Sequence, residues 1–354
     1  MRISWSKCAF FMKTCGTSKA ERSFMKIGII GGGKVGSTLA RHLSTRLVGI
    51  VGSSSEKTTQ LATKYKVPCM THAELAAKAD LVLLTVPDRQ IAIVAKSLAA
   101  EAQQEPAIGS TVYLHCSGSL DLSPLKPLQD IGAFVGSLHP LQSFAGENTV
   151  LKGIYMAIDG DEKAQQAAHE LATILEGRSF HVPAADRPLY HAAACICANY
   201  TVTLQAMAQE LMSRWLVPTK ISDSTKDSAK GSTNEAPANV SGSGSVIMDS
   251  TKPSKAAWQA LLPLFQGVAA NLEKAENPGS ALTGPIARGD INTVQSHLGV
   301  LPKNMIPVYI QLGMATTQLA LMNQTITPLM AEELFDLFNS VHYEATTKEE
   351  TSHE

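Results

Sequence analysis

A glycine-rich turn directly after an apolar strand constrains the fold of this chain more than any other feature of the sequence. Gly31, Gly33 and Gly36 form a G-x-G-x-x-G pattern that follows the apolar stretch 26–30 and opens a predicted helix at 34–43. In such a turn the first glycine makes the bend, the second lets the backbone approach a pyrophosphate, and the third lets helix and strand pack closely. Free N–H groups at the helix N-terminus attract the phosphates. The pattern predicts a dinucleotide-binding site.

Behind this turn, apolar strands alternate with helices over residues 25–184. Further strands are expected near residues 46–53, 67–70, 79–86, 109–116, 133–140, 153–160 and 178–182. Continuous apolar strands that alternate with helices indicate a parallel sheet covered on both faces. The prediction is an α/β Rossmann domain with a parallel, doubly wound sheet.

After Val182 the alternation stops and helix-like stretches take over. They lie at 187–217, 256–275, 290–300, 304–324 and 328–343. Two segments, 256–272 and 304–331, carry no charged residue, but their Pro, Asn, Gln and Thr argue against membrane spans. We expect an all-α domain at 185–345 whose helices are buried on most faces, in part against a second copy of the chain. The expected assembly is a homodimer through this domain.

Three segments do not read as packed structure. Residues 1–24 hold five Lys and Arg but one acid, which is typical either of an organellar presequence or of a disordered leader before a second start at Met25. Residues 219–256 are rich in Ser, Lys, Gly and Asp and predict a flexible insertion, with phosphorylation as the alternative role. Residues 346–354 are expected to form a tail.

Charge and cysteine content exclude several classes of function. The net charge is −1, so no basic field is available for nucleic acid or anionic lipid. None of the six cysteines forms a C-x-x-C pair or a zinc-site spacing with histidine, so we expect no metal. Reduced thiols favour a cytoplasmic protein that binds a small-molecule substrate.

The end of the second strand bears on the choice of dinucleotide. An NAD site usually has Asp or Glu there, on the ribose 2′-hydroxyl. Here Ser53, Ser54 and Ser55 occupy the place with Lys57 close by, and hydroxyls beside a cation suit the 2′-phosphate of NADP(H). The alternative is that the serines only cap the next helix. The expected cofactor contacts lie on this strand end, on the glycine turn and after the third strand, at Gly31, Gly33, Lys34, Val35, Gly36, Ser53, Ser54, Ser55, Lys57, Val86 and Pro87.

Polar residues follow the later strands of the predicted sheet. Ser117 comes after the strand near 109–116, and His139 lies at the end of the next one. Ligands of open parallel sheets sit outside the carboxyl ends of the strands, so we expect at least one of the two to contact substrate or nicotinamide. The alternative is that they only make hydrogen bonds that close loops. Cys116 is expected to pack, because nothing in the sequence suggests a base that activates it.

Several of these motifs together resemble a known family. The stretches "IGIIGGGKVGSTLA", "VPD", "HCSG", "HPLQSF", "YHAAACICANY" and "ALTGPIARGDINTVQSHL" are similar to those of oxidoreductases built from a Rossmann-like domain and the domain of unknown function 2520. The resemblance covers 25–343 except 219–256. That family looks like a branch of the superfamily of ketopantoate reductases, pyrroline-5-carboxylate reductases and β-hydroxyacid dehydrogenases. The resemblance implies NADPH-dependent reduction of a small C=O or C=N.

The first helix of the second domain departs from that superfamily. The superfamily often has Lys and then Asn four residues later, whereas here His191 stands at the Lys position, Cys195 follows at +4 and Asn199 at +8. The departure leaves the substrate in doubt more than the hydride chemistry.

Three residues of the second domain are candidates for substrate chemistry. His191 is a candidate proton donor, because imidazole titrates near neutrality, and Asn199 is a candidate hydrogen-bond partner of the substrate. They lie roughly 12 Å apart along a helix, so they border one cleft without touching one atom. Arg288 is a candidate carboxylate partner. The alternatives are satisfied polar groups in a helical core and, for Arg288, pairing with a nearby acid.

The predicted function is therefore reduction of a small carbonyl, such as a ketopantoate-like 2-oxo acid, by NADPH. The predicted catalytic residues are His191, Asn199, Ser117 and His139, and Arg288 is the predicted substrate-binding residue. The alternatives are a reductase of a cyclic imine and a non-catalytic NADP(H)-binding sensor. Convergence of the catalytic candidates around one cleft distinguishes an enzyme from a sensor.

Overall fold

The computed structural model describes residues 24–52, 55–216 and 253–350, without the side chains of 55 and 342–350. The leader up to residue 23, Ser53, Ser54, the side chain of Ser55, the insertion up to residue 252 and the end of the tail lie outside the described residues. Contacts divide the chain into two compact units, Met1–Tyr200 and Thr201–Glu354. This division falls within a helical run, and the domain boundary expected at 184–185 stays a prediction.

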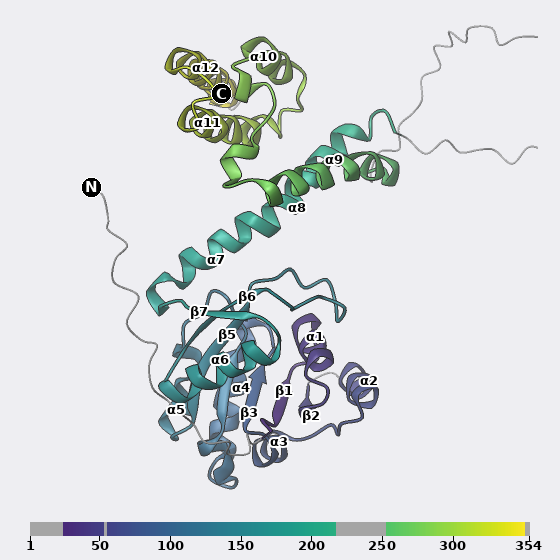
Figure 1. Ribbon diagram of the computed structural model, residues 1–354, viewed down its shortest axis with the longest axis vertical. Helices are drawn as coiled ribbons and strands as arrows, with labels where there is room; N and C mark the ends of the chain where they lie inside the picture. The colour runs from purple at the N-terminus through teal and green to yellow at the C-terminus, as the bar shows by residue number, and fades with distance from the viewer. Residues whose placement is uncertain (1–23, 53–54, 217–252, 351–354) are drawn as a thin grey trace, which may run out of the picture. The chain divides into compact units, whose positions relative to one another are not determined.

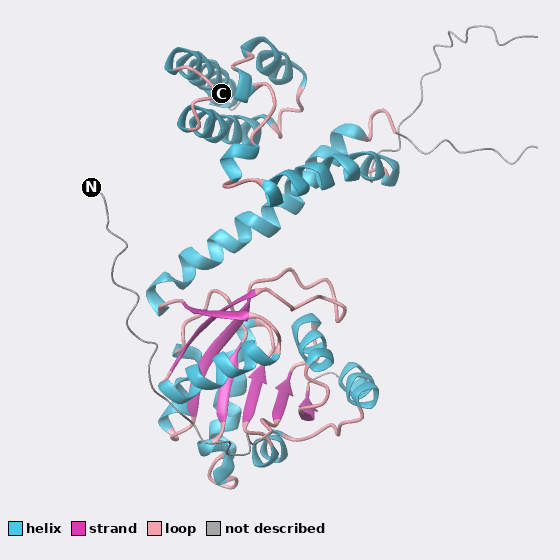
Figure 2. Cartoon of the chain, viewed as in Figure 1, coloured by secondary structure: helices cyan, strands magenta, loops and turns pink. Residues whose placement is uncertain are grey.

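The described part of the first unit holds a seven-stranded sheet with the order β2-β1-β3-β4-β5-β6-β7 (Figures 1 and 2). Its strands are β1 (Ile27–Ile30), β2 (Leu47–Val51), β3 (Leu81–Leu84), β4 (Val112–His115), β5 (Phe134–Pro140), β6 (Tyr155–Gly160) and β7 (Arg178–His181). The short strand expected near 67–70 is only a single bridge between Ile50 and Cys69. The predicted Rossmann fold is confirmed.

The last two strands, β6 and β7, correct the expectation of a wholly parallel sheet, because both run opposite to the other five. The strands from β2 to β5 are parallel, and β7 is parallel to β6, but β6 runs antiparallel to β5. A parallel neighbour would need a crossover connection, usually a helix. The connection 141–154 between β5 and β6 has none, so β6 returns directly beside β5 in the opposite direction.

Helices cover both faces of this sheet, as the doubly wound prediction requires. One core cluster joins the sheet to α1 (Lys34–His42), α2 (Ser55–Tyr65) and α6 (Glu162–Ile174). The other joins it to α3 (His72–Lys78), α4 (Asp88–Glu101) and α5 (Lys126–Asp130). Short 3₁₀ turns are η1 (Pro106–Ser110), η2 (Ser123–Leu125) and η3 (Ala184–Asp186). The strands β1 and β3 are buried along their whole length between the two layers, which explains their unbroken apolar sequence.

A helical run follows β7, as predicted, but it is not buried as predicted. It consists of α7 (Arg187–Cys195), one π-helical turn (Ile196–Tyr200) and α8 (Thr201–Met212). Arg187 is the only buried residue of α7, and α8 has none. The expectation of a helix buried on most faces is wrong for the single chain, because a lack of charge does not by itself bring a packing partner.

The second unit continues with α9 (Lys255–Lys274), α10 (Ile291–Val300), α11 (Ile306–Met322) and α12 (Pro328–Glu350), with 3₁₀ turns η5 (Pro278–Ala281) and η6 (Ile286–Arg288). Its core lies among α10, α11 and α12, where Val294, Ile310 and Phe338 are fully buried. Gly313 lets α11 and α12 approach, since a Cβ there would lie 2.3 Å from the Phe338 ring. The predicted helical C-terminal region is confirmed.

The long helices were expected not to span a membrane. None of the helices in the described part of the chain combines the length and the apolar character that a bilayer crossing requires. The expected cytoplasmic location stays a prediction.

Candidate functional site

The glycine turn after β1 has the shape that a bound phosphate group requires. Gly31 has a φ of +112°, which L residues rarely adopt. A Cβ on Gly36 would lie 2.0 Å from the Gly31 carbonyl oxygen, so this glycine closes the turn against the helix. A Cβ on Gly33 would instead meet no atom within 4 Å, and no side chain caps the N-terminus of α1 there. Gly33 thus leaves an open space in front of free helix N–H groups, which fits a dinucleotide phosphate.

The other predicted cofactor residues that the structure describes lie on α1, on α2 and at the junction of β3 and α4. Lys34 is exposed on the first turn of α1 and Val35 is half-buried beside it. The turn packs on the end of β3, because a Cβ on Gly31 would lie 3.0 Å from the Val86 nitrogen. Pro87 follows at the start of α4, and Lys57 is exposed on α2. Lys57 makes no ion pair with any residue that the structure describes. Its cofactor role stays a prediction.

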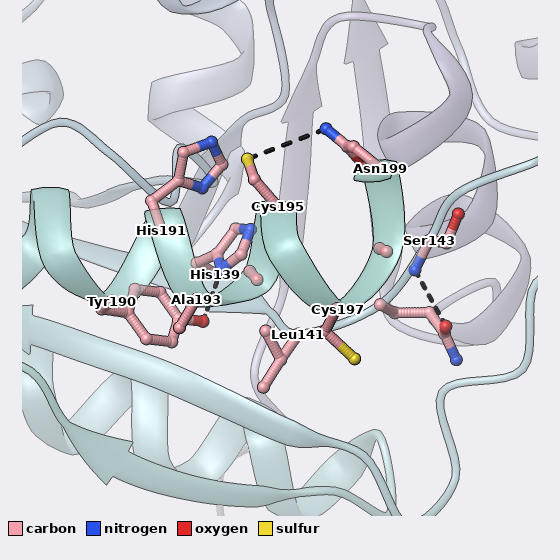
Figure 3. Close-up of a pocket in the computed structure, with 12 residues that line it drawn as sticks. His139, Leu141, Ser143, Tyr190, His191, Ala193, Cys195, Cys197 and Asn199 are labelled. Carbon is pink, nitrogen blue, oxygen red and sulfur yellow. Dashed lines mark hydrogen bonds between the residues drawn. The ribbon is translucent and has the colours of Figure 1, made fainter. Parts of the chain in front are cut away.

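A cavity of about 400 Å³ lies beside the carboxyl end of β5 and the start of the helical run (Figure 3). Its lining comes from β5, from the connection that follows it, from α7 and from the π-helical turn. The lining residues are His139, Leu141, Gln142, Ser143, Tyr190, His191, Ala193, Ala194, Cys195, Cys197, Ala198 and Asn199. Three predicted catalytic residues, His139, His191 and Asn199, therefore lie around one cavity. None of the described lining residues is charged.

The two histidines lie next to each other at one end of the cavity. Their ring centroids are 6.1 Å apart and the rings are nearly perpendicular. His139 Nδ1 is hydrogen-bonded to the Tyr190 hydroxyl at 2.7 Å. Both rings rest on Gly118, where a Cβ would lie 2.7 Å from His191 Nδ1 and 2.8 Å from His139 Nε2. Both imidazole rings therefore pack against Gly118, the glycine of the "HCSG" motif.

Ser117, the fourth predicted catalytic residue, directly precedes Gly118, but its side chain does not line the cavity. Its hydroxyl donates a hydrogen bond to Asp88 Oδ2 at 2.7 Å and accepts the backbone N–H groups of Ser119 and Leu120. The residue is 6% exposed. These contacts are those of the loop-closing alternative, and a catalytic role for Ser117 stays a prediction.

A fully buried arginine fixes the start of α7 against the sheet. Arg187 donates hydrogen bonds to the Ser117 carbonyl oxygen and to the Ser137 hydroxyl, and its Nε lies 4.0 Å from Asp159 Oδ2. Residues three and four positions later share its helix face, and these are Tyr190 and His191. Arg187 thereby aims both side chains at β5.

Burial controls the protonation of the groups around the cavity. It lowers the pKa of His139 to about 4, with the neighbouring His191 and Arg187 acting in the same direction. Burial also raises the pKa of Tyr190 to about 12. At neutral pH both groups are uncharged. The pKa of Cys116 is raised to about 12 by burial, which agrees with its predicted packing role.

The remaining candidates are Asn199 in the first unit and Arg288 in the second. Asn199 is exposed on the π-helical turn and its Nδ2 donates to Cys195 Sγ at 3.7 Å. Arg288 is exposed at the end of η6. The pKa of Asp290 is lowered mainly by hydrogen bonds from Thr293, and Arg288 acts in the same direction. Asp290 caps α10 by accepting the Thr293 N–H, which agrees with the local alternative for this motif. No group of three or more potential metal ligands is assembled within the described residues.

Three residues at the site, Arg187, Tyr190 and Gly118, were not predicted. Tyr190 and Gly118 both stand in quoted motifs, but their importance comes from a contact between α7 and β5 that no local pattern encodes. The signal present in the sequence was spacing, because Tyr190 and His191 follow the charged Arg187 by three and four positions.

Fold and site together define a Rossmann-like domain followed by a helical domain. Residues 12–140 match the Rossmann-like domain, and residues 154–316 match the domain of unknown function DUF2520. The predicted resemblance to these two domains is confirmed. No curated protein matches the sequence significantly.

Solved structures share the fold at low sequence identity. A proposed NADP oxidoreductase of Bacteroides fragilis is 21% identical with a TM-score of 0.58, covering 83% of this chain and 98% of its own. A protein of Thermotoga maritima is 21% identical with a TM-score of 0.57, covering 84% and 99%. A 1-pyrroline-5-carboxylate reductase of Streptococcus pyogenes is 17% identical with a TM-score of 0.48, covering 90% and 98%. The first two likenesses show the fold.

Proposed function

We propose that this protein is an NADP(H)-dependent oxidoreductase that reduces a small C=O or C=N group. The observation that carries the proposal is the position of the cavity. Since β1, β3, β4 and β5 are parallel, the glycine turn after β1 and the histidines beside β5 lie at the same edge of the sheet. Ligands of such sheets bind along that edge. The Bacteroides fragilis protein of the same fold is named for NADP, which agrees with the proposal.

Two parts of the chain would carry out the reaction: the glycine turn would bind the cofactor, and the cavity would bind and protonate the substrate. The glycine turn and the N-terminus of α1 would hold the pyrophosphate, and Lys57 would favour the 2′-phosphate of NADP(H) over NAD(H). A bound nicotinamide would supply the hydride. The imidazoles of His139 and His191 would bind the reacting group and provide the proton that a new hydroxyl or amine needs. Asn199, farther along the cavity, would orient the rest of the substrate.

The cavity also bears on the substrate. A 2-oxo acid has a carboxylate, which proteins usually bind with Arg or Lys. The described lining residues offer no such cation. This observation favours a second candidate, an uncharged imine or ketone, beside the ketopantoate-like acid.

The decisive experiment is NADPH oxidation by the purified chain against a panel of substrates. The panel contains 2-oxo acids, neutral ketones, and cyclic imines with and without a carboxylate. We expect turnover of at least one member and preference for NADPH over NADH. Equal use of NADH would contradict the assigned preference, and tight NADPH binding without any turnover would favour a sensor.

We propose in addition that the protein is a homodimer assembled through its helical unit. The helices α8 and α9 leave large apolar side chains uncovered in the single chain, with Val202 69% and Leu264 67% exposed. Burial of such surface against a second copy would stabilise the assembly. Light scattering should give twice the mass of the 37.7 kDa chain, and Leu264→Glu should shift it toward one copy.

A further inference from the structure

Tyr190 is held against His139 by contacts from two sides. Its hydroxyl oxygen lies 2.7 Å from His139 Nδ1, and its ring meets the Phe180 ring of β7 edge-on with centroids 5.8 Å apart. Figure 3 shows the hydrogen bond at the end of the cavity, with His191 beside the pair. Tyr190 also lines the cavity itself. The phenol is therefore a fixed partner of the imidazole and not a free surface group.

The hydrogen-bonding capacity of the two groups indicates the direction of this bond. Among the described residues, the Tyr190 hydroxyl has no acceptor other than His139 Nδ1. If Nδ1 carried a proton and donated it to the phenol oxygen, the phenol hydrogen would lack a protein acceptor. The arrangement that satisfies both groups has Tyr190 donating to a bare Nδ1. A neutral imidazole then carries its hydrogen on Nε2.

The other side of His139 faces a second, unsatisfied nitrogen. A Cβ on Gly118 would lie 2.8 Å from His139 Nε2 and 2.7 Å from His191 Nδ1, so both atoms border the same small space. His191 Nδ1 is buried and has no hydrogen-bond partner among the described residues. One N–H group and one unpaired ring nitrogen therefore face each other beside the cavity. A carbonyl oxygen or an imine nitrogen is the kind of atom that would complete such a site.

We propose that Tyr190 is a positioning residue that holds His139 as the Nε2–H tautomer, and that this N–H delivers the proton to the substrate. The inference rests on the proposed reduction and deepens it. As the carbonyl carbon gains the hydride, its π electron pair moves to oxygen, which takes the proton from His139 Nε2. Nδ1 takes the Tyr190 hydroxyl proton in turn, and water in the cavity returns a proton to the phenolate. His139 is then neutral with its hydrogen on Nδ1, and exchange of that hydrogen with solvent restores the Nε2–H form before the next turnover.

The electrostatics of the site support this arrangement. Burial lowers the pKa of His139 to about 4 and raises the pKa of Tyr190 to about 12. At neutral pH the imidazole is therefore not a cation and the phenol is not an anion. Each group therefore carries the proton that it gives up in the relay: His139 on Nε2 and Tyr190 on its hydroxyl.

The first test reads the tautomer and needs no turnover. Long-range proton–nitrogen spectra of the ¹⁵N-labelled full chain distinguish a protonated Nε2 from a protonated Nδ1, and the signals are assigned by their loss in His139→Gln. We expect the neutral Nε2–H form of His139 at pH 7, and a mixture of tautomers in Tyr190→Phe. A protonated Nδ1 in the wild type, or an unchanged tautomer in Tyr190→Phe, would overturn the proposal.

The second test uses the substrate that the panel identifies. Tyr190→Phe should lower kcat by about tenfold or more with KM within about twofold, because the phenol acts on the proton and not on binding. Tyr200→Phe is the matched control, since Tyr200 is 60% exposed and does not line the cavity. Equal kcat in wild type and Tyr190→Phe would overturn the relay. No turnover by the wild type would instead overturn the proposed reduction, and the tautomer would still decide the role of Tyr190.

Discussion

Gly118 is the residue on which the geometry of the site depends most directly. It has no positive φ that demands glycine, but a Cβ would lie within 2.9 Å of both histidine rings. The constraint is thus one of space and comes from α7 and β5 packing onto the same loop. A glycine required for contact with side chains leaves no signature in its own neighbourhood of the sequence.

Gly118→Ala should therefore disturb the histidines more than the fold. Because the ends of two side chains oppose the new methyl group, the rings should move and unfolding should become easier by about 1–3 kcal/mol. The His139 tautomer signal should become mixed, and kcat should fall. Denaturant unfolding and the histidine spectra check both effects.

Gly299→Ala is the control for that substitution. A Cβ on Gly299 would meet nothing within 4 Å inside α10, so alanine should stabilise the helix by about 0.5–1 kcal/mol. Wild-type histidine spectra in Gly118→Ala would contradict the described packing.

Single residues were predicted where local chemistry marks them. His139 was expected from its place at a strand end, and His191 from its place on the first helix of the second domain. The partners that orient them were missed, because Arg187 and Tyr190 act through contacts over 50 or more residues of sequence. Long-range pairing of this kind has no periodicity that a sequence alone can reveal.

At the scale of elements, periodicity gave most of the sheet and nearly all the helices. The helix α3 was missed although Thr71 and Glu74 form a capping box at its start, with hydrogen bonds in both directions. Its seven residues are too few for a clear apolar period. The direction of β6 was also missed, because a buried strand has the same apolar sequence pattern whether it runs parallel or antiparallel to its neighbour.

The glycine turn offers a prediction that separates folding from binding. Gly36→Ala places a methyl group 2.0 Å from a backbone oxygen, which cannot move without opening the turn, so stability should fall by about 3 kcal/mol or more. Gly33→Ala places it in open space, so stability should change by less than about 0.5 kcal/mol. Only the second variant should fold normally yet bind NADPH at least about tenfold more weakly. Denaturant unfolding and NADPH fluorescence titration measure the two quantities.

The two variants are controls for each other. Unchanged NADPH affinity in Gly33→Ala would show that no cofactor phosphate approaches this turn, and would remove the main support for the dinucleotide site. An undiminished stability in Gly36→Ala would contradict the close packing of α1 on β1.

At the scale of the whole molecule, the sequence predicted the fold class of each domain more accurately than it predicted which surfaces are buried. The helices after β7 were expected to be buried on most faces, yet Leu189 is 76% exposed in the single chain. Apolar composition reports that a surface avoids water, and it does not say whether the same chain or another covers it. The proposed homodimer is the assembly that would resolve this difference.

Two buried histidines of the Rossmann-like domain make the stability of the molecule depend on pH. Burial lowers the pKa of both His115 and His139 to about 4, from an ordinary value near 6.5. Between these values the unfolded chain binds protons at both positions and the folded chain does not. The free energy of unfolding should therefore be fully present above pH 6.5 and fall as the pH drops toward 4, by up to about 1.4 kcal/mol per pH unit for each histidine.

Denaturant unfolding at a series of pH values between 7 and 4.5 measures this slope. In His139→Gln one titrating group is gone, so about half of the pH dependence should disappear while the His115 contribution stays. The carboxyl of Asp121, whose pKa is lowered by hydrogen bonds from Ser123, loses its contribution only below this range and does not obscure the result. A stability that is constant from pH 7 to 4.5 would mean that the imidazoles are protonated within the fold, and a neutral His139 could then not serve the proposed relay.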